Sequence, residues 1–202
     1  MKKILIFVWL TLFIQCQTQT KQKSMIPIVD NKFEKFDIKT FKKNLENGFY
    51  IFQENEFLNR CYTQSNGYLQ EIYSHNSIYS LNKFFYNNGN IHKKGYYINE
   101  GSLVGIWYYF DESGKLIKEE DTDAGYDFQP EDVIKYCEKN KIILPKGYQT
   151  SGYQTRILKE NMEGKKAWRI SYQIAGDKIQ EIILDGKTGK ELEKKVVPFH
   201  NP

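Results

Sequence analysis

Short runs of aromatic and β-branched residues, separated by turns that contain glycine, fill the chain from residue 50 to residue 121. Asn-Gly and Ser-Gly pairs between such runs are typical of β-hairpin turns. Three of these turns recur as SNGYL at 65–69, NNGNI at 87–91 and ESGKL at 113–117, with Gly67, Gly89 and Gly114 spaced 22 and 25 residues apart. A hairpin unit of this size cannot bury one face alone, so the pattern predicts hairpins that stack on their neighbours.

The segment at 95–120, GYYINEGSLVGIWYYFDESGKLIKEE, resembles a MORN-variant repeat. The matching positions are Gly101, Gly105, Trp107, Tyr109, Gly114 and Leu116. Weaker copies at 79–95 and 57–73 extend the resemblance over residues 57–120. The resemblance implies a non-catalytic binding or scaffolding surface, and bacterial relatives are often regarded as antitoxins.

The second half of the chain has a different pattern. Pro130 with acidic neighbours predicts a helix that ends near Asn140, because proline and acidic residues suit the first helical turn. Strands are expected at 154–159, 167–174, 178–184 and 191–197. This order resembles the PepSY domain over residues 129–195, with matches at Trp168, Asp185, Thr188, Gly189 and Lys190. The resemblance implies a small helix-plus-antiparallel-sheet domain without catalytic activity.

A short helix is expected at 37–48, with Asp37 as its N-cap, Ile38, Phe41 and Leu45 on one face, and Gly48 after its end. The whole chain is therefore predicted to be an α+β protein, mostly antiparallel β. Residues 31–122 would form the helix and the stacked MORN-like β-hairpins, and residues 123–202 the PepSY-like domain.

The first residues predict export. Lys2 and Lys3 precede an apolar run at 4–14, which is too short to span a membrane and is typical of a secretory signal. The LFIQC stretch that ends at Cys16 resembles the lipobox of bacterial lipoproteins, although Phe13 and Gln15 depart from its usual residues. We therefore expect a signal peptide at 1–15, lipidation of Cys16 and a polar tether at 16–30. The resemblance implies an outer-membrane lipoprotein that faces the periplasm or the cell surface, and another type of signal peptide is the alternative.

The sequence offers no catalytic motif. His75, His92 and His200 lie far apart and no Cys-x-x-Cys occurs, so neither a metal nor a cofactor is expected. The Gly-Lys-Thr at 186–188 lacks the upstream glycine of a phosphate-binding loop, and the Asp185-Gly186 pair predicts a hairpin turn instead. Lys2 and Lys3 account for part of the net charge of +4 and would be removed with the expected signal peptide. The mature chain is then nearly neutral, so it is not expected to bind nucleic acid. Cys61 and Cys137 either pair in an oxidising compartment or are separate buried thiols.

Blocks of adjacent aromatic residues must place rings on both faces of a strand, because neighbouring side chains point to opposite sides. One face is the core, and the other is a candidate binding surface. The candidates are Tyr86, Tyr97, Trp107, Tyr109, Tyr148 and Tyr153, the last two from the duplicated GYQT at 147–150 and 152–155.

These features predict a non-enzymatic cell-envelope lipoprotein that is anchored to a membrane by lipid and binds another macromolecule. A protein partner is the leading expectation, with an immunity or antitoxin role. A glycan-binding envelope protein is the first alternative. A small periplasmic hydrolase with a dispersed site is the second.

Overall fold

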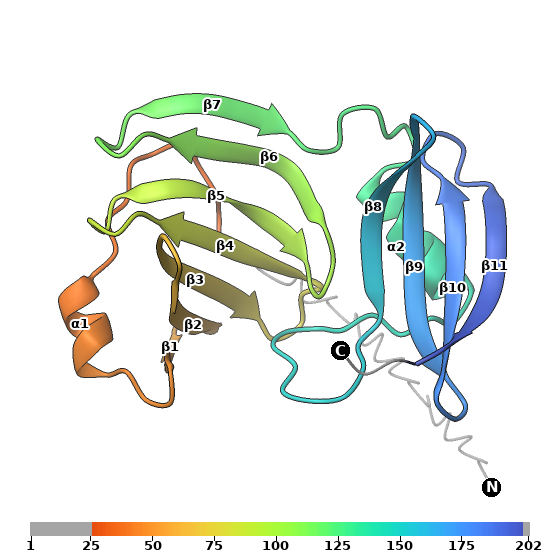
Figure 1. The fold of residues 1–202 in the computed structure, drawn as a ribbon, viewed down its shortest axis with the longest axis horizontal. Coiled ribbons are helices and arrows are strands. Elements are labelled where there is room, and N and C mark those ends of the chain that lie inside the picture. Colours follow the sequence, from red (N-terminus) through yellow and green to blue (C-terminus); the bar gives the residue numbers. More distant parts are fainter. Residues whose placement is uncertain (1–25, 200–202) are drawn as a thin grey trace, which may run out of the picture.

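A computed structural model describes residues 26–199 and contains two antiparallel sheets and two helices (Figure 1). The first sheet has seven strands in sequence order, and the second has four in the order β11-β10-β9-β8. The elements are α1 (Ile38–Lys43), β1 (Phe49–Glu54), β2 (Phe57–Gln64), β3 (Gly67–Ser74), β4 (Tyr79–Phe85), β5 (Ile91–Ile98), β6 (Leu103–Phe110), β7 (Leu116–Asp121), α2 (Pro130–Lys139), β8 (Arg156–Met162), β9 (Lys165–Ile174), β10 (Lys178–Asp185) and β11 (Glu191–Pro198). The predicted α+β class with mostly antiparallel strands is confirmed.

The hairpins of the first sheet turn at the expected glycines. Gly67, Gly89 and Gly114 all have positive φ angles, of 144°, 83° and 89°. At Gly114 a Cβ atom would also lie 2.3 Å from the ring of Phe33, so a side chain there meets both strain and a steric clash. Sequence-order pairing of all seven strands follows from these short connections.

Helix α1 begins where expected but is shorter than the predicted 37–48. Asp37 caps it, and its Oδ1 accepts a hydrogen bond from the backbone N–H of Thr40 at 2.9 Å. The helix ends at Asn44, whose side chain and backbone N–H both bond to the carbonyl of Thr40, at 2.8 and 3.2 Å. Leu45 is consequently 42% exposed instead of extending the apolar face. The local competition of the asparagine amide with further helical turns accounts for the difference.

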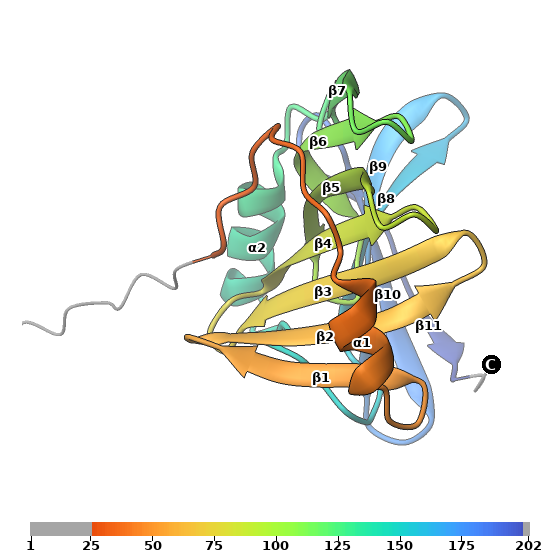
Figure 2. The same ribbon diagram turned by 90° about the vertical axis from the view of Figure 1, so that its left-hand side faces the viewer.

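An N-terminal strap, residues 26–37, crosses one face of the seven-stranded sheet (Figure 2). Lys94 of β5, fully buried, donates to Asp30 Oδ1 at 3.1 Å, to the carbonyl of Lys32 at 2.8 Å and to Glu34 Oε1 at 2.5 Å. Residues 26–30, assigned to the expected tether, lie on the sheet in this structure. The reason is that the acidic residues of the strap neutralise a lysine in the middle of the sheet. Residues 16–25 of the expected tether, and Cys16 with the signal segment, lie outside the described residues.

The second sheet packs one face against α2. Ile170 and Trp168 of β9 alternate with Arg169 and point to the core, where they meet Val133 of α2. The helix and the four strands of this half occur where they were expected, with shifts of a few residues at some ends. The described residues contain no helix that is both long enough and apolar enough to cross a membrane.

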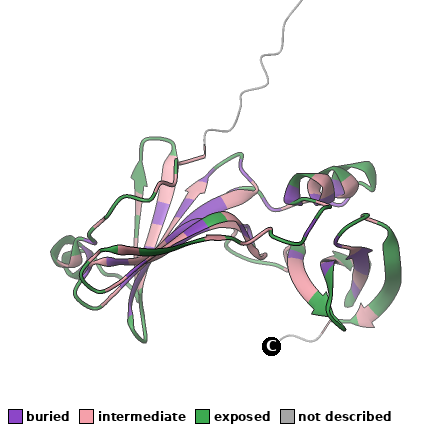
Figure 3. Cartoon of the chain, turned by 90° about the horizontal axis from the view of Figure 1, so that it is seen from above, coloured by how far each residue is buried: buried purple, intermediate pink, exposed green. Residues whose placement is uncertain are grey.

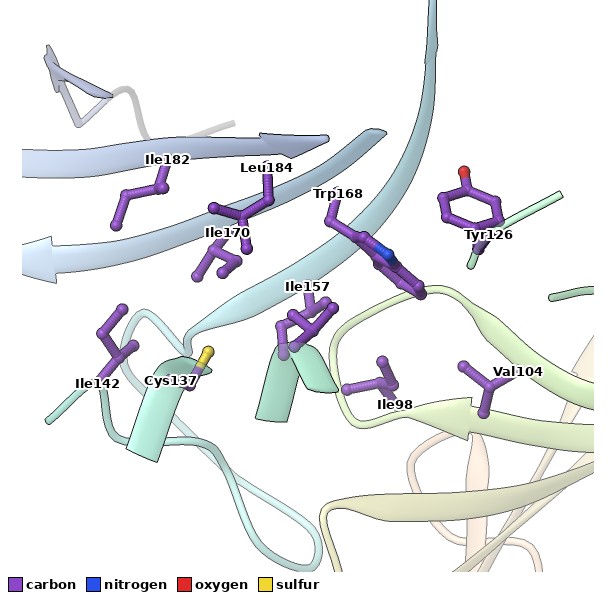
Figure 4. Packing of buried hydrophobic residues seen from close by; sticks show 11 residues of the cluster. Ile98, Val104, Tyr126, Cys137, Ile142, Ile157, Trp168, Ile170, Ile182 and Leu184 are labelled. Atoms are coloured by element: carbon purple, nitrogen blue, oxygen red, sulfur yellow. The ribbon is translucent and has the colours of Figure 1, made fainter. Parts of the chain in front are cut away.

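One hydrophobic cluster joins the two sheets. Ile98 and Val104, from β5 and β6, pack in the same cluster as Ile157 and Trp168 of the second sheet (Figure 4). The backbone N–H of Ser102 bonds to the carbonyl of Ile157 at 3.0 Å. The two sheets, at 49–121 and 156–198, thus share one core.

The two described cysteines lie in different cores. Cys61 packs with Phe36, Phe41 and Tyr68 under the strap, whereas Cys137 belongs to the cluster that joins the sheets. Both are free and buried, so the disulfide considered for them is not formed and the alternative of separate thiols holds. Burial raises the pKa of each thiol to about 12.

Candidate binding face

The second face of the seven-stranded sheet carries a continuous row of aromatic and charged side chains. The strand register places these side chains on the side opposite to the strap. We call this surface the aromatic face, and it consists of Phe49, Arg60, Tyr62, Glu71, Tyr73, Phe84, Lys93, Tyr97, Trp107 and Tyr109. Helix α2 lies on the strap side, since Tyr79, which points to that side, reaches Glu131. Figure 3, seen from above, shows the strap and α2 on one side of this sheet.

Arg60 lies at one end of the aromatic face, between Glu71, Phe49 and Tyr62. Its Nη1 lies 2.8 Å from Glu71 Oε2 on the neighbouring strand, and Tyr62 donates to the other carboxylate oxygen at 3.3 Å. The guanidinium carbon lies 4.1 Å from the ring centroid of Phe49 and 4.7 Å from that of Tyr62. An arginine held between rings and a carboxylate loses little further freedom on binding, which favours recognition.

Trp107 lies beneath the other end of this face and is fully buried. Its ring covers Gly95, where a Cβ atom would lie 2.3 Å from the indole, and its Nε1 donates to the carbonyl of Tyr96 at 3.2 Å. Tyr97 packs edge-on against it at 5.3 Å. Trp107 was expected to contact a partner directly, and in this structure it cannot. It supports the half-buried ring of Tyr97 instead.

Tyr97 and Tyr109 are half-buried on the aromatic face, as candidates for binding require. Tyr109 donates to Glu120 Oε2 at 2.7 Å, which fixes the phenol. The ammonium group of Lys93 lies 4.6 Å from the ring centroid of Phe84. This end of the face therefore presents phenol edges and one cation held over a ring.

The duplicated GYQT segments diverge to the two sheets. The ring of Tyr148 lies 5.4 Å from that of Tyr73, and the guanidinium of Arg60 lies 5.4 Å from the Tyr148 ring. Tyr153 instead donates to Ser171 on the second sheet at 3.0 Å and packs edge-on against Phe199 at 5.5 Å. The first tyrosine thus extends the aromatic face, and the second lies on another surface.

A buried asparagine holds this loop in place. The side-chain amide nitrogen of Asn99 lies 3.0, 3.2 and 3.3 Å from the carbonyl oxygens of Ser77, Pro145 and Gly147. The backbone N–H of Gly147 also bonds to Ser77 at 2.8 Å. The position of Tyr148 therefore depends on a residue in the turn between β5 and β6.

Tyr86, the remaining candidate, lies apart from the aromatic face. Its hydroxyl donates to the carbonyl of Phe110 at 2.8 Å, and its ring centroid lies 4.4 Å from that of His92. These contacts hold it beside the turn that follows β4. The structure thus brings Tyr97, Tyr109 and Tyr148 onto one surface and leaves Tyr86 and Tyr153 elsewhere.

The aromatic face is suited to binding by neutral donors and stacking rings. Burial, together with neighbouring carboxylates, raises the pKa of Tyr62 and of Tyr109 to about 12, so both phenols stay protonated at physiological pH. Across residues 26–199 no group of three His, Cys, Asp or Glu side chains is placed to hold a metal ion.

The turn with the Gly-Lys-Thr triplet is closed by its own carboxylate. Asp185 Oδ1 accepts the backbone N–H groups of Lys187 and Thr188 at 3.0 and 2.8 Å. A phosphate would need these donors, and an aspartate at their centre would repel it. Gly189 has the expected positive φ of 69°, whereas Gly186 is needed because a Cβ there would lie 2.6 Å from the carbonyl of Lys166.

Sequence reasoning missed Arg60, Glu71 and Tyr73, which form the best-defined part of the face. Their only signal was the alternation along β2 and β3, which places Arg60 opposite Glu71 once the register is known. A lone arginine and a lone glutamate in separate strands carry no motif. Comparison of the chain with protein-family models, curated proteins and solved structures found no match.

Proposed function

We propose that this chain is a non-enzymatic cell-envelope lipoprotein that binds a protein partner through its aromatic face. The observation that carries the proposal is the row of half-buried tyrosines around the Arg60–Glu71 pair, on the side of the sheet opposite to the strap. Tyrosine, tryptophan and arginine are enriched at the energetic centres of protein interfaces. Lipidation of Cys16 and location at the outer membrane rest on the N-terminal sequence.

An immunity or antitoxin role is the specific form of this proposal. The resemblance of residues 57–120 to MORN-variant repeats supports it, as does the PepSY-like pattern at 129–195. Such a protein needs a rigid surface that blocks a partner, and the fixed Arg60 and Tyr109 side chains suit that task. A protein whose binding side chains are already in place changes little in backbone geometry when it binds.

Capture of a stoichiometric protein from envelope extracts tests the proposal. Tyr97→Ser and Lys93→Glu alter the aromatic face, and Tyr50→Ser is the matched control on the strap side of the same sheet. We expect the first two variants to weaken capture about tenfold or more, as for residues at the centre of an interface. Unchanged capture by both, with equal folding, would contradict the assignment of the face.

Glycan binding is a second candidate, and a cavity on the second sheet favours it. This cavity of about 990 Å³ is lined by residues that include Tyr153, Arg156, Gln173 and Phe199. Aromatic rings beside amide and guanidinium groups suit sugar rings and their hydroxyl groups. Calorimetric titration with envelope polysaccharide should give binding that Tyr153→Ala abolishes and Tyr97→Ser leaves intact. No heat of binding would remove this candidate.

A further inference from the structure

Two isoleucines project further into solvent than any other large aliphatic residue within 26–199. Ile28 is 89% exposed and Ile143 is 85% exposed. Ile143 lies in the loop KIILPK, residues 141–146, between α2 and β8. Its neighbours Ile142 and Leu144 pack into the shared core, and its carbonyl accepts a hydrogen bond from Thr155 at 2.6 Å. The loop is therefore held in a conformation that presents Ile143 outward.

The strap begins at the same place on the surface. Ile26 and Ile143 both line a cavity of about 390 Å³, together with Ile78 and Leu144. Ile28 follows two residues after Ile26, which lines this cavity together with Ile134 of α2. The expected anchor is Cys16, and the ten residues 16–25 ahead of Ile26 can reach about 35 Å at most.

Lysines flank the exposed isoleucine. Lys141 and Lys146 are both exposed, and neither has an ion-pair partner among the described residues. Aliphatic side chains enter the boundary between headgroups and acyl chains, while nearby lysines are attracted to anionic lipids. The aromatic face differs from this patch, since it carries the closed Arg60–Glu71 pair, phenols and a lysine held over an aromatic ring instead of aliphatic side chains.

We infer that Ile28, Lys141, Ile143 and Lys146, which we call the isoleucine patch, dock on the surface of an anionic bilayer. The inference rests on the proposed lipid anchor at Cys16, which would hold the patch within reach of the membrane. The strap carries Ile28 on the side of the sheet opposite to the aromatic face. Docking through the patch therefore directs the aromatic face away from the lipid, toward a partner in the aqueous compartment.

Quenching of an added tryptophan by brominated acyl chains tests this orientation. The lipidated full chain is reconstituted on vesicles of phosphatidylethanolamine and phosphatidylglycerol, with Ile143→Trp as reporter. Ile51→Trp is the matched control, since Ile51 is 49% exposed and pairs with Arg60, which places it on the aromatic face. The native Trp107 and Trp168 are fully buried, and subtraction of the parent protein removes their emission. We expect at least a twofold (~50%) loss of the Ile143→Trp signal and no loss for the control.

Other outcomes separate the docking from the anchor. Ile28→Trp serves as a second reporter and should be quenched as well. Vesicles that carry the protein while both reporters keep their full emission would overturn the docking but leave the anchor intact. Equal quenching of Ile51→Trp would also overturn it, because neither side of the sheet would then be preferred. Protein that does not float with the vesicles would refute the anchor and, with it, the docking.

Discussion

The ring of Tyr148 packs against that of Tyr73 with their centroids 5.4 Å apart, although one belongs to a loop before β8 and the other to β3. This contact extends the aromatic face with a residue from the second half of the chain. It also means that the surface proposed to bind a partner depends on how the two halves are joined.

Asn99→Ala should release the loop that carries Tyr148. The substitution removes an amide that serves buried carbonyl groups, so we expect a loss of about 1–3 kcal/mol in the free energy of unfolding. Denaturant titration measures it, and Asn161→Ala at an exposed position serves as control. Hydrogen exchange at residues 147–150 should rise in the first variant alone. Unchanged exchange there would show that other contacts hold the loop.

Arg60→Met should destabilise the aromatic face more than the loss of a surface ion pair. It leaves Glu71, whose side chain is 12% exposed, without its cation, so about 2–4 kcal/mol of unfolding free energy should be lost. Glu71→Gln in the same background should recover part of this loss, because it removes the unpaired charge. Additive effects of the two substitutions in a double-mutant cycle would mean that the pair is not coupled.

Lys94→Met should detach the strap from the sheet. Asp30 and Glu34 would lose the buried ammonium group that binds both, so limited proteolysis should cut within residues 26–37. Lys42→Met, at an exposed position in α1, should leave the strap protected. Equal cleavage of both variants would show that the apolar contacts of Phe36 alone decide the strap's position.

The same cluster gives the protein a defined response to acid. Burial opposes the ionisation of Glu34, but hydrogen bonds from Lys83 and Lys94 hold its pKa below the reference value of 4.5. Its contribution to stability is complete above pH 4.5 and is lost as the pH falls through the lowered pKa. Thermal melting across this range should show a drop that Glu34→Gln reduces. A parallel pH profile in that variant would exclude Glu34 as the source.

The turns were the part of the fold that the sequence predicted best. Gly67, Gly89 and Gly114 predicted the hairpins, because these turns need a residue that tolerates a positive φ angle. The helix at Pro130 was also predicted from local residues, because proline and its acidic neighbours suit the first helical turn.

Contacts between distant segments escaped prediction. Lys94 has the composition of a surface residue, and only the return of Asp30 and Glu34 from 64 and 60 residues earlier makes its burial possible. The two copies of GYQT have the same letters, yet one tyrosine meets Arg60 and the other Ser171. Alternation predicted two faces for each aromatic block, but it could not tell which face the strap would cover.

The attachment of the strap has a mechanical consequence. Tension applied to the chain ahead of Ile26 passes through the strap to Lys94 and Tyr96 in β5, a central strand, before it reaches any edge of the sheet. Strands pulled from an edge separate one hydrogen bond at a time, whereas a load on a central strand is shared by both of its neighbours. The first sheet is therefore expected to resist unfolding when the chain is pulled from the side of Ile26.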